Sequence, residues 1–224
     1  MTSFDKIFSI MTRPWAIFCY FGFVILSYCY LDQPVAYYFY HLDLKIKTSF
    51  LLWIIKVGVA PLYLVGFFLL ALFCRYIKRN EAWAGRFWFL WLCVLIPTFI
   101  CLVLKIILGR ARPELLFDSH LFGFYGFHLN SLFWSFPSGH TSTLMGLVLG
   151  LGILFPRHCY TLFFIGLALA SLRVLLTDHY MSDVLASSYL ALIEIGIFLF
   201  VLKRKAWLIK RIDVASNQAL FDLD

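Results

Sequence analysis

The sequence predicts an all-α integral membrane protein, a six-transmembrane-helix bundle in one domain that covers residues 1–224. Hydrophobic residues make up 62% of the chain and charged residues only 14%, whereas an ordinary soluble domain is about 25% charged. A bilayer-spanning helix needs roughly 20 apolar residues, and six such runs can be drawn. They cover about 14–30, 51–74, 85–108, 139–155, 159–177 and 183–202.

The first run is expected to be a retained span, because no small-residue cleavage site precedes Asp32. Each later boundary contains charged residues, proline or polar residues. These boundaries are 75–86, 109–138, 156–158 and 177–182. The six cysteines lie in or beside apolar runs without metal or redox spacing, so they are expected to be unpaired and structural.

Lys and Arg residues predict the orientation. If the N-terminus is inside, twelve of them fall in the inner segments, and the outer segments hold only Lys45, Lys47, Arg110 and Arg112. The positive-inside rule then places both termini in the cytoplasm. This charge bias is typical of a bacterial inner membrane with the other face in the periplasm, and it leaves an organelle membrane open as the alternative. The net charge of +7 is explained by this topology and by anionic lipids, so no nucleic-acid partner is expected.

Two outer stretches, 31–50 and 115–136, are rich in Phe and Tyr. Such segments are typical of the head-group layer, so interfacial helices are expected there. They could serve for anchoring, for recognition of a lipid substrate, or for both.

Three short segments bring ionisable groups to the outer ends of the spans. Such groups are costly beside a membrane span, so a functional role is expected for them. The first contains Lys105 and Arg112-Pro113; Gly109 and Pro113 indicate that the helix ends between the two cations, with Arg112 in an extended segment. Cations of this kind can hold a phosphate group, Arg by two parallel hydrogen bonds. Arg110 stands outside the spacing pattern and is interpreted as an interfacial residue that reaches toward the head groups.

The second segment is Pro137-Ser138-Gly139-His140, directly before an apolar run. A helix that starts here directs its N–H groups at an anion. Ser138 can cap that helix and donate to a phosphate oxygen, while Gly139 allows close approach of the backbone. The third segment contains Arg173, His179 and Asp183, where a carboxylate can orient an imidazole four residues away.

In this order and spacing, the three segments resemble the signature of the type 2 phosphatidic acid phosphatase (PAP2) and vanadium haloperoxidase superfamily, in its bacterial membrane lipid phosphatase branch. The match runs from Lys105 to Asp183, about a third of the chain. One position departs from it: the family often has Ser directly before the last Arg, whereas Leu172 stands here and Ser171 one step earlier.

The resemblance implies a metal-independent phosphatase without a cofactor. His179 would be the nucleophile and form a phosphohistidine, Asp183 would orient it, and His140 would protonate the leaving oxygen. The residues expected to bind the phosphate are Lys105, Arg112, Ser138, Gly139 and Arg173.

The expected activity is hydrolysis of a phosphate monoester or pyrophosphate of a membrane lipid on the periplasmic face. Undecaprenyl pyrophosphate, a lipid A phosphate, phosphatidylglycerophosphate and phosphatidate all remain possible substrates. One alternative is a lipid-to-lipid phosphotransferase of the same family. Another is a small transporter that uses two ionisable residues inside predicted spans, Lys56 and Glu194. The sequence leaves the oligomeric state open.

Overall fold

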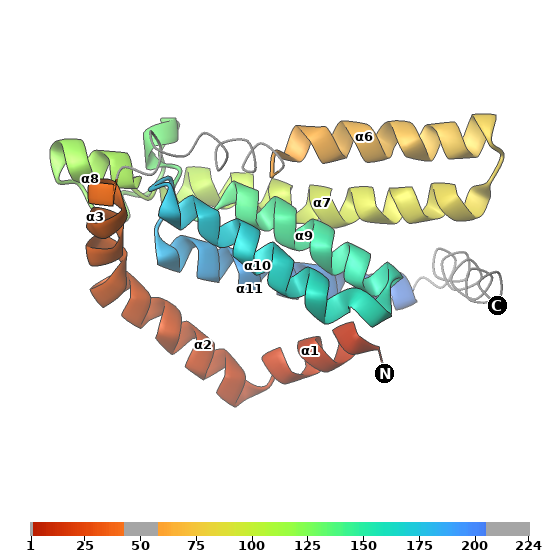
Figure 1. Cartoon of the computed structure of the whole chain (residues 1–224), viewed down its shortest axis with the longest axis horizontal. Coiled ribbons are helices and arrows are strands. Elements are labelled where there is room, and N and C mark those ends of the chain that lie inside the picture. The colour runs from red at the N-terminus through yellow and green to blue at the C-terminus, as the bar shows by residue number, and fades with distance from the viewer. Residues whose placement is uncertain (1, 43–57, 205–224) are drawn as a thin grey trace.

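The computed structural model describes residues 2–42 and 58–204, and the regular secondary structure within those ranges is helical, as predicted. Its elements, drawn in Figure 1, are α1 (Ser3–Met11), α2 (Pro14–Leu26), the π-helical turn η1 (Ser27–Leu31), α3 (Asp32–Leu42), α6 (Ala60–Leu72), the π-helical turn η2 (Phe73–Ile77), α7 (Glu81–Leu108), α8 (Pro113–Ser119), the 3-10 turns η3 (Ser131–Phe133) and η4 (Pro156–His158), α9 (Gly139–Leu154), α10 (Cys159–Leu175) and α11 (Met181–Arg204).

Within the described residues, five helices are long and apolar enough to cross a membrane, namely Pro14–Leu42, Ala60–Ile77, Glu81–Leu108, Pro156–Leu175 and Met181–Arg204. The remaining predicted run, 139–155, forms α9, which has only 16 residues. The first run was predicted to end near residue 30, but its helix continues to Leu42 through the π-helical turn. The predicted start of the second run, 51–57, lies outside the described residues.

Helix α9 is the centre of the bundle. It packs against α7, α10 and α11, and its side chains are buried on every face, as expected for a helix that is apolar all round (Figure 1). Its contact with α7 depends on small residues. A Cβ added at Gly146 would collide with the carbonyl oxygen of Cys93, and one at Gly150 would lie 3.0 Å from the Cβ of Cys93. Glycines spaced four apart therefore let the two backbones approach closely.

Helix α7 carries the first motif to one end of the bundle. It begins at an Asn80 cap, whose side chain accepts a hydrogen bond from the Trp83 N–H at 3.1 Å. It ends at Gly109, which adopts a left-handed backbone with φ of +48°. A Cβ there would collide with the carbonyl oxygen of Gly126, so glycine is required by both conformation and space. The helix end predicted between Lys105 and Arg112 is confirmed.

The outer stretch 115–136 folds over this end of α7. The N–H of Tyr125 donates to the carbonyl of Gly109 at 2.9 Å, and the N–H of Gly126 donates to that of Leu108 at 3.2 Å. Between residues 113 and 136, only α8 and the short η3 turn are helical. The other residues of this stretch form turns and isolated β-bridges. The segment is therefore a cover that packs on the ends of helices.

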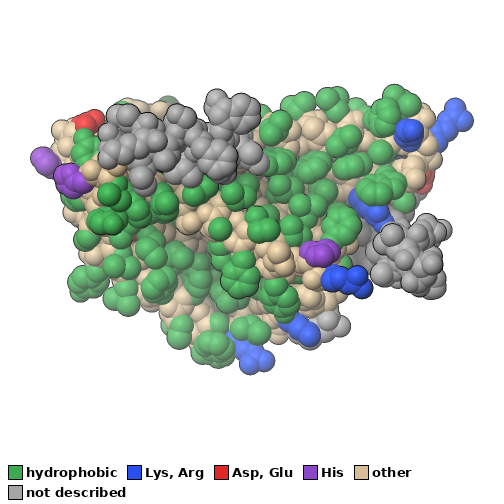
Figure 2. Space-filling view, viewed as in Figure 1, with side chains coloured by type: hydrophobic (Ala, Val, Ile, Leu, Met, Phe, Trp, Pro, Cys, Tyr) green, Lys and Arg blue, Asp and Glu red, His purple; other side chains and the backbone are tan. Residues whose placement is uncertain are grey.

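The surface matches a bilayer environment. Hydrophobic side chains cover the middle of the face shown in Figure 2, and the Lys and Arg side chains seen there lie from the middle of the lower edge to the end that holds the α6–α7 turn. Large apolar residues on the outward faces are strongly exposed, including Phe18, Phe68, Phe99 and Phe164. Lipid tails are the solvent that suits such a surface.

Candidate active site

The three motifs meet in one cavity of about 350 Å³, which we call the motif cavity. It lies where the C-terminal ends of α7 and α10 approach the N-terminal end of α9. Six of the eight predicted site residues line it: Lys105, Arg112, Gly139, His140, Arg173 and His179. The other two, Ser138 and Asp183, are fully buried and do not line it. The structure thus brings together residues up to 74 positions apart in the chain.

Three cations face this cavity from different elements. Lys105 is nearly buried near the end of α7, and its Nζ donates to the carbonyl of Trp134 at 2.5 Å. Arg173, near the end of α10, pairs with Asp178 at 3.1 Å. Arg112 has the predicted extended backbone, with φ of −76° and ψ of 160°, and precedes α8. A cavity with three fixed cations is suited to a multiply charged anion.

His179 is held in one tautomer. Its Nδ1 lies 2.8 Å from the carbonyl oxygen of Ser135. A carbonyl can only accept, so the ring hydrogen sits on Nδ1 and leaves the Nε2 lone pair available to the cavity. Burial, together with the charges of Lys105 and Arg173, lowers the pKa of His179 to about 3, although Asp183 opposes both effects. The imidazole is therefore neutral near neutral pH, as a nucleophile requires.

Asp183 stands behind His179 and is fully buried. Its Oδ2 is 3.6 Å from Nδ1 of His179, farther than the Ser135 carbonyl. The same Oδ2 accepts from the Ser135 hydroxyl at 2.7 Å and from the Tyr180 N–H at 3.0 Å. The carboxylate thus acts on the imidazole both by its charge and through Ser135, a residue that sequence reasoning missed.

Ser138 occupies the N-cap position of α9, but the prediction that its side chain caps the helix was wrong. Its hydroxyl accepts from the Thr141 hydroxyl at 3.0 Å, while its N–H donates to the Ser187 hydroxyl at 2.6 Å. Because α9 is clamped onto α11 here, the Ser138 side chain turns into the protein. Gly139 and His140, the next two residues, line the motif cavity.

The prediction for Arg110 was also wrong. Its side chain is fully buried and pairs with Asp32 at 2.7 Å and with Asp183 at 2.5 Å. The physical reason is the presence of two buried carboxylates, which attract the guanidinium into the bundle. Asp32 was read from the sequence only as the end of an apolar run. An acidic residue at the end of a span needs a partner, and that signal could have indicated this pairing.

Ser171, which might have replaced the hydroxyl missing at Leu172, does not reach the site. It is exposed on α10, and its hydroxyl donates to the carbonyl of Ala168 in its own helix at 2.7 Å. Of the two residues considered for a transporter, Lys56 lies outside the described residues. Glu194 is buried in α11 and does not line the motif cavity.

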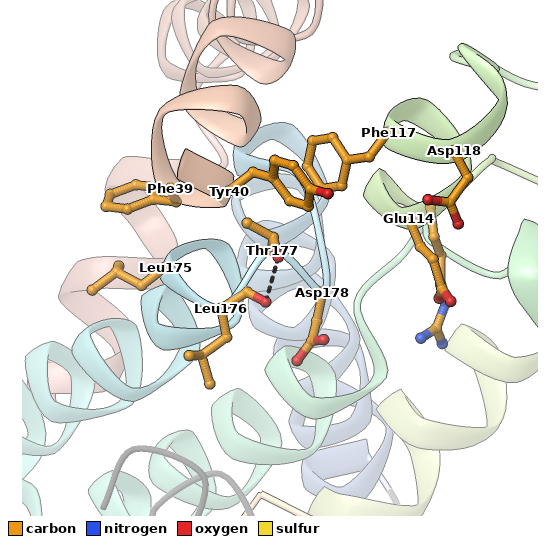
Figure 3. Close-up of a pocket in the computed structure, with 10 residues that line it drawn as sticks. Phe39, Tyr40, Glu114, Phe117, Asp118, Leu175, Leu176, Thr177 and Asp178 are labelled. Carbon is orange, nitrogen blue, oxygen red and sulfur yellow. Dashed lines mark hydrogen bonds between the residues drawn. The ribbon is translucent and has the colours of Figure 1, made fainter. Parts of the chain in front are cut away.

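A second cavity of about 330 Å³ adjoins the first, and we call it the α8 cavity. Figure 3 shows its walls: Phe39 and Tyr40 from α3, Glu114, Phe117 and Asp118 from α8, Leu175 at the end of α10, and Leu176, Thr177 and Asp178 after it. The rings of Tyr40 and Phe117 stack with centroids 4.0 Å apart. Arg112 lines both cavities, and Asp178 pairs with Arg173 of the motif cavity, so the two spaces share a charged wall.

Comparison with known proteins agrees with this arrangement. The family model of the PAP2 superfamily matches residues 86–207, more than half of the chain and all three motifs. The chain belongs to the PAP2 superfamily. No solved structure matches the chain.

Two curated relatives share part of the sequence. A lipid A 1-phosphatase of Rhizobium johnstonii is 35% identical over 105 residues, which cover 47% of this chain and 42% of the relative. A lipid A 1-phosphatase of Rhizobium etli is 34% identical over 105 residues, which cover 47% of this chain and 44% of the relative. The chain thus matches less than half of the length of these curated relatives.

Proposed function

We propose that this PAP2 protein is a metal-independent lipid phosphatase that cleaves a phosphate monoester or pyrophosphate through a phosphohistidine on His179. The observation that carries the proposal is the motif cavity itself. A neutral imidazole with its hydrogen on Nδ1 shares that cavity with Lys105, Arg112 and Arg173. Phosphoryl transfer needs mainly positioning and neutralisation of charge, and these groups supply both.

In the first step, Nε2 of His179 attacks phosphorus. The P–N bond forms as the ester P–O bond breaks, and protonated His140 gives its proton to the departing oxygen. In the second step, His140 takes a proton from water, whose oxygen attacks phosphorus. The P–N bond then breaks, which releases inorganic phosphate and restores neutral His179. The three cations and the Gly139 backbone hold the phosphate in both steps.

The relatives favour a lipid A phosphate as the first substrate to test, because both are lipid A 1-phosphatases. The α8 cavity supports a substrate with a polar group beyond its phosphate. Its aromatic pair and the carboxylates of Glu114 and Asp118 would accept hydrogen bonds from hydroxyl or amide groups. Undecaprenyl pyrophosphate carries no such group, whereas a glycolipid does.

We further propose that the site faces the periplasm from the inner membrane. The motif cavity lies at the end of the bundle that carries α8, whereas Arg75, Lys78 and the last turn of α11 lie at the opposite end (Figure 1). The positive-inside rule assigns the end with the surplus of Lys and Arg to the cytoplasm.

The test of this function is phosphate release from purified protein with a panel of lipid phosphates and pyrophosphates. We expect His179→Ala to lower turnover by about 10³-fold or more, because nucleophile removal elsewhere has effects of that size. A second lipid added as acceptor separates hydrolysis from phosphotransfer. Turnover of the variant at the wild-type rate would remove His179 from its assigned role.

Two reagents test the chemistry independently of mutation. Vanadate, which adopts the pentacoordinate geometry of the transition state, is expected to inhibit. Chelators are expected to leave the rate unchanged, because the three cations supply the charge that a metal would otherwise provide. A strict requirement for a divalent cation would contradict the mechanism.

A further inference from the structure

Arg110 is the largest fully buried side chain of the described residues, yet it lines neither cavity. A buried guanidinium is costly unless it is paired and hydrogen-bonded. Its Nη2 donates to Asp32 at 2.7 Å, and its Nη1 donates to Asp183 at 2.5 Å and to the Ser182 hydroxyl at 2.7 Å. One cation thus joins two carboxylates, those of Asp32 and Asp183, that are far apart in the sequence.

Asp32 is fixed on its other side by α11. The Ser182 N–H donates to its Oδ1 at 2.9 Å, and the Ser182 hydroxyl donates to its Oδ2. Both carboxylates and the guanidinium have no exposed surface. The group is therefore a closed unit of one positive and two negative charges, away from water, where electrostatic interactions are strong.

Four aromatic rings enclose the guanidinium. Its Cζ lies 4.5 Å from the ring centroid of Tyr180, 4.9 Å from Tyr28, 5.3 Å from Phe124 and 5.5 Å from Phe122. Contacts of this kind stabilise a cation and exclude water at the same time. Although burial lowers the pKa of Arg110, the charges of Asp183 and Asp32 raise it overall, so Arg110 remains a fixed cation.

Ser135 connects Arg110 to His179 by two routes. The N–H of Ser135 donates to the backbone carbonyl of Arg110 at 3.0 Å, which fixes the segment whose own carbonyl accepts from Nδ1 of His179. The Ser135 hydroxyl donates to Asp183, the carboxylate that Arg110 pairs. Arg110 is therefore connected to the imidazole both through its backbone carbonyl and through its side chain.

We propose that Arg110 and Asp32 are positioning residues for His179, a role that rests on the proposed function of His179 as nucleophile. They keep Asp183 ionised and in place, so that His179 retains its hydrogen on Nδ1 and directs Nε2 at phosphorus. The unit also balances charge. Its net charge of −1 compensates the positive charge that the imidazole gains as the P–N bond forms.

The test compares Asp32→Asn with wild type in single-turnover experiments that trap the phosphohistidine by acid quench. The substitution keeps the shape and removes one negative charge. We expect phosphoenzyme formation to slow by roughly 10- to 30-fold. The reason is that one negative charge fewer then stabilises the positive imidazole, at an effective dielectric constant of about 20. We expect KM to change by less than about twofold, because Asp32 does not line the cavity.

Two variants complete the design. Glu194→Gln makes the same kind of acid-to-amide substitution at another buried position of the bundle and serves as the matched control, with wild-type phosphoenzyme formation expected. Arg110→Lys keeps the charge but cannot bridge two carboxylates with a planar fork, and it is expected to lower kcat at constant KM. Melting temperatures in detergent establish that each variant is folded.

Wild-type phosphoenzyme formation in folded Asp32→Asn would overturn the proposal. An equal loss in Glu194→Gln would overturn it too, because any acid-to-amide substitution inside the bundle would then have the same effect. Failure of the proposed function is a distinct result, in which wild type releases phosphate from no lipid. In that case the Nδ1–H signal of His179, read by 15N NMR of histidine-labelled protein, tests the positioning alone. The signal is expected to weaken in Arg110→Lys, and an unchanged signal would contradict the proposal.

Discussion

At the scale of single residues, the candidate site places a neutral side chain next to a charged one. His179 is nearly buried and is neutral near neutral pH, while Asp183, four residues later, pairs with the fixed cation of Arg110. Buried groups with such different surroundings carry different charges at the same pH. That difference lets one side chain supply a lone pair while the next supplies a countercharge.

The pKa of His179 predicts how stability depends on pH. The folded state holds the imidazole neutral with a pKa of about 3, whereas an unfolded histidine binds a proton below about pH 6.5. Stability is therefore full above about pH 6.5 and falls as the pH drops toward 3, with a limiting slope of about 1.4 kcal/mol per pH unit. Melting temperature against pH should show a weaker acid-side decline in His179→Asn. Parallel curves for the two proteins would contradict this.

The geometry of Arg112 makes a second prediction at this scale. Arg112 lines both cavities, and its planar fork suits two parallel hydrogen bonds to a phosphate. Arg112→Lys keeps the charge but not the fork, so kcat/KM is expected to fall by roughly 10-fold or more. The control is Arg86→Lys, at the far end of α7, for which no change in kinetics is expected. Equal kinetics for both variants would argue against a phosphate contact.

At the scale of elements, the alignment of the motif cavity depends on how closely α7 and α9 approach. α7 carries Lys105 and α9 begins beside His140, and both side chains line the motif cavity. The distance between the two helices is set in their middle turns, where Gly146 and Gly150 of α9 contact Cys93 of α7. Small residues in the middle of the bundle therefore fix the alignment of charged residues at its end.

We expect Gly146→Ala to lower both stability and activity, because the new Cβ would collide with the Cys93 carbonyl and push the helices apart. Overpacking of this kind costs about 1–3 kcal/mol. Gly85→Ala in α7 is the matched control, since nothing lies within 4 Å of a Cβ added there. Thermal melting in detergent and phosphate release measure both effects. A variant at position 146 that behaves like the one at 85 would show that the helices tolerate separation.

Helix α8 gives the substrate-specific prediction. The double variant Glu114→Gln/Asp118→Asn removes two carboxylates from the α8 cavity without touching the motif cavity. We expect KM for a lipid A phosphate to rise by roughly 10-fold, as for the loss of one or two hydrogen bonds, while undecaprenyl pyrophosphate is unaffected. An equal change with both lipids would show that the α8 cavity does not hold the head group.

At the scale of the whole molecule, two kinds of positive charge separate along the membrane normal. The cations of the motif cavity lie at the α8 end, and exposed Arg75, Lys78 and Arg79 lie at the end of the α6–α7 turn. In the proposed function the first set holds the phosphate, and in the proposed topology the second set faces the cytoplasm under the positive-inside rule.

Thiol labelling tests this orientation. Cysteine at Ser119, exposed at the end of α8, is expected to react with a membrane-impermeant maleimide on intact spheroplasts. Cysteine at Lys78, exposed at the α6–α7 turn, is expected to react only after lysis. The parent protein is the control for its own six cysteines. The reverse pattern would place the site in the cytoplasm.

Much of this architecture follows from local chemistry. Apolar runs of bilayer length predict helices, and glycine and proline near residues 109–113 predict where α7 ends. The motif residues were identified because cations, imidazoles and carboxylates at span ends are costly without a function. Residue types and spacing therefore determined the helical bundle and six of the residues that line the motif cavity.

Only the tertiary structure decided where each side chain turns. Arg110 and Arg112 are two residues apart, yet one pairs with buried Asp32 and Asp183 while the other faces two cavities. No pattern in the motif separates them, because the choice depends on a carboxylate contributed 78 positions earlier in the chain. The Ser138 hydroxyl likewise bonds Thr141 instead of capping its helix. Long-range electrostatics and packing decide such orientations, and both exist only once the chain has folded.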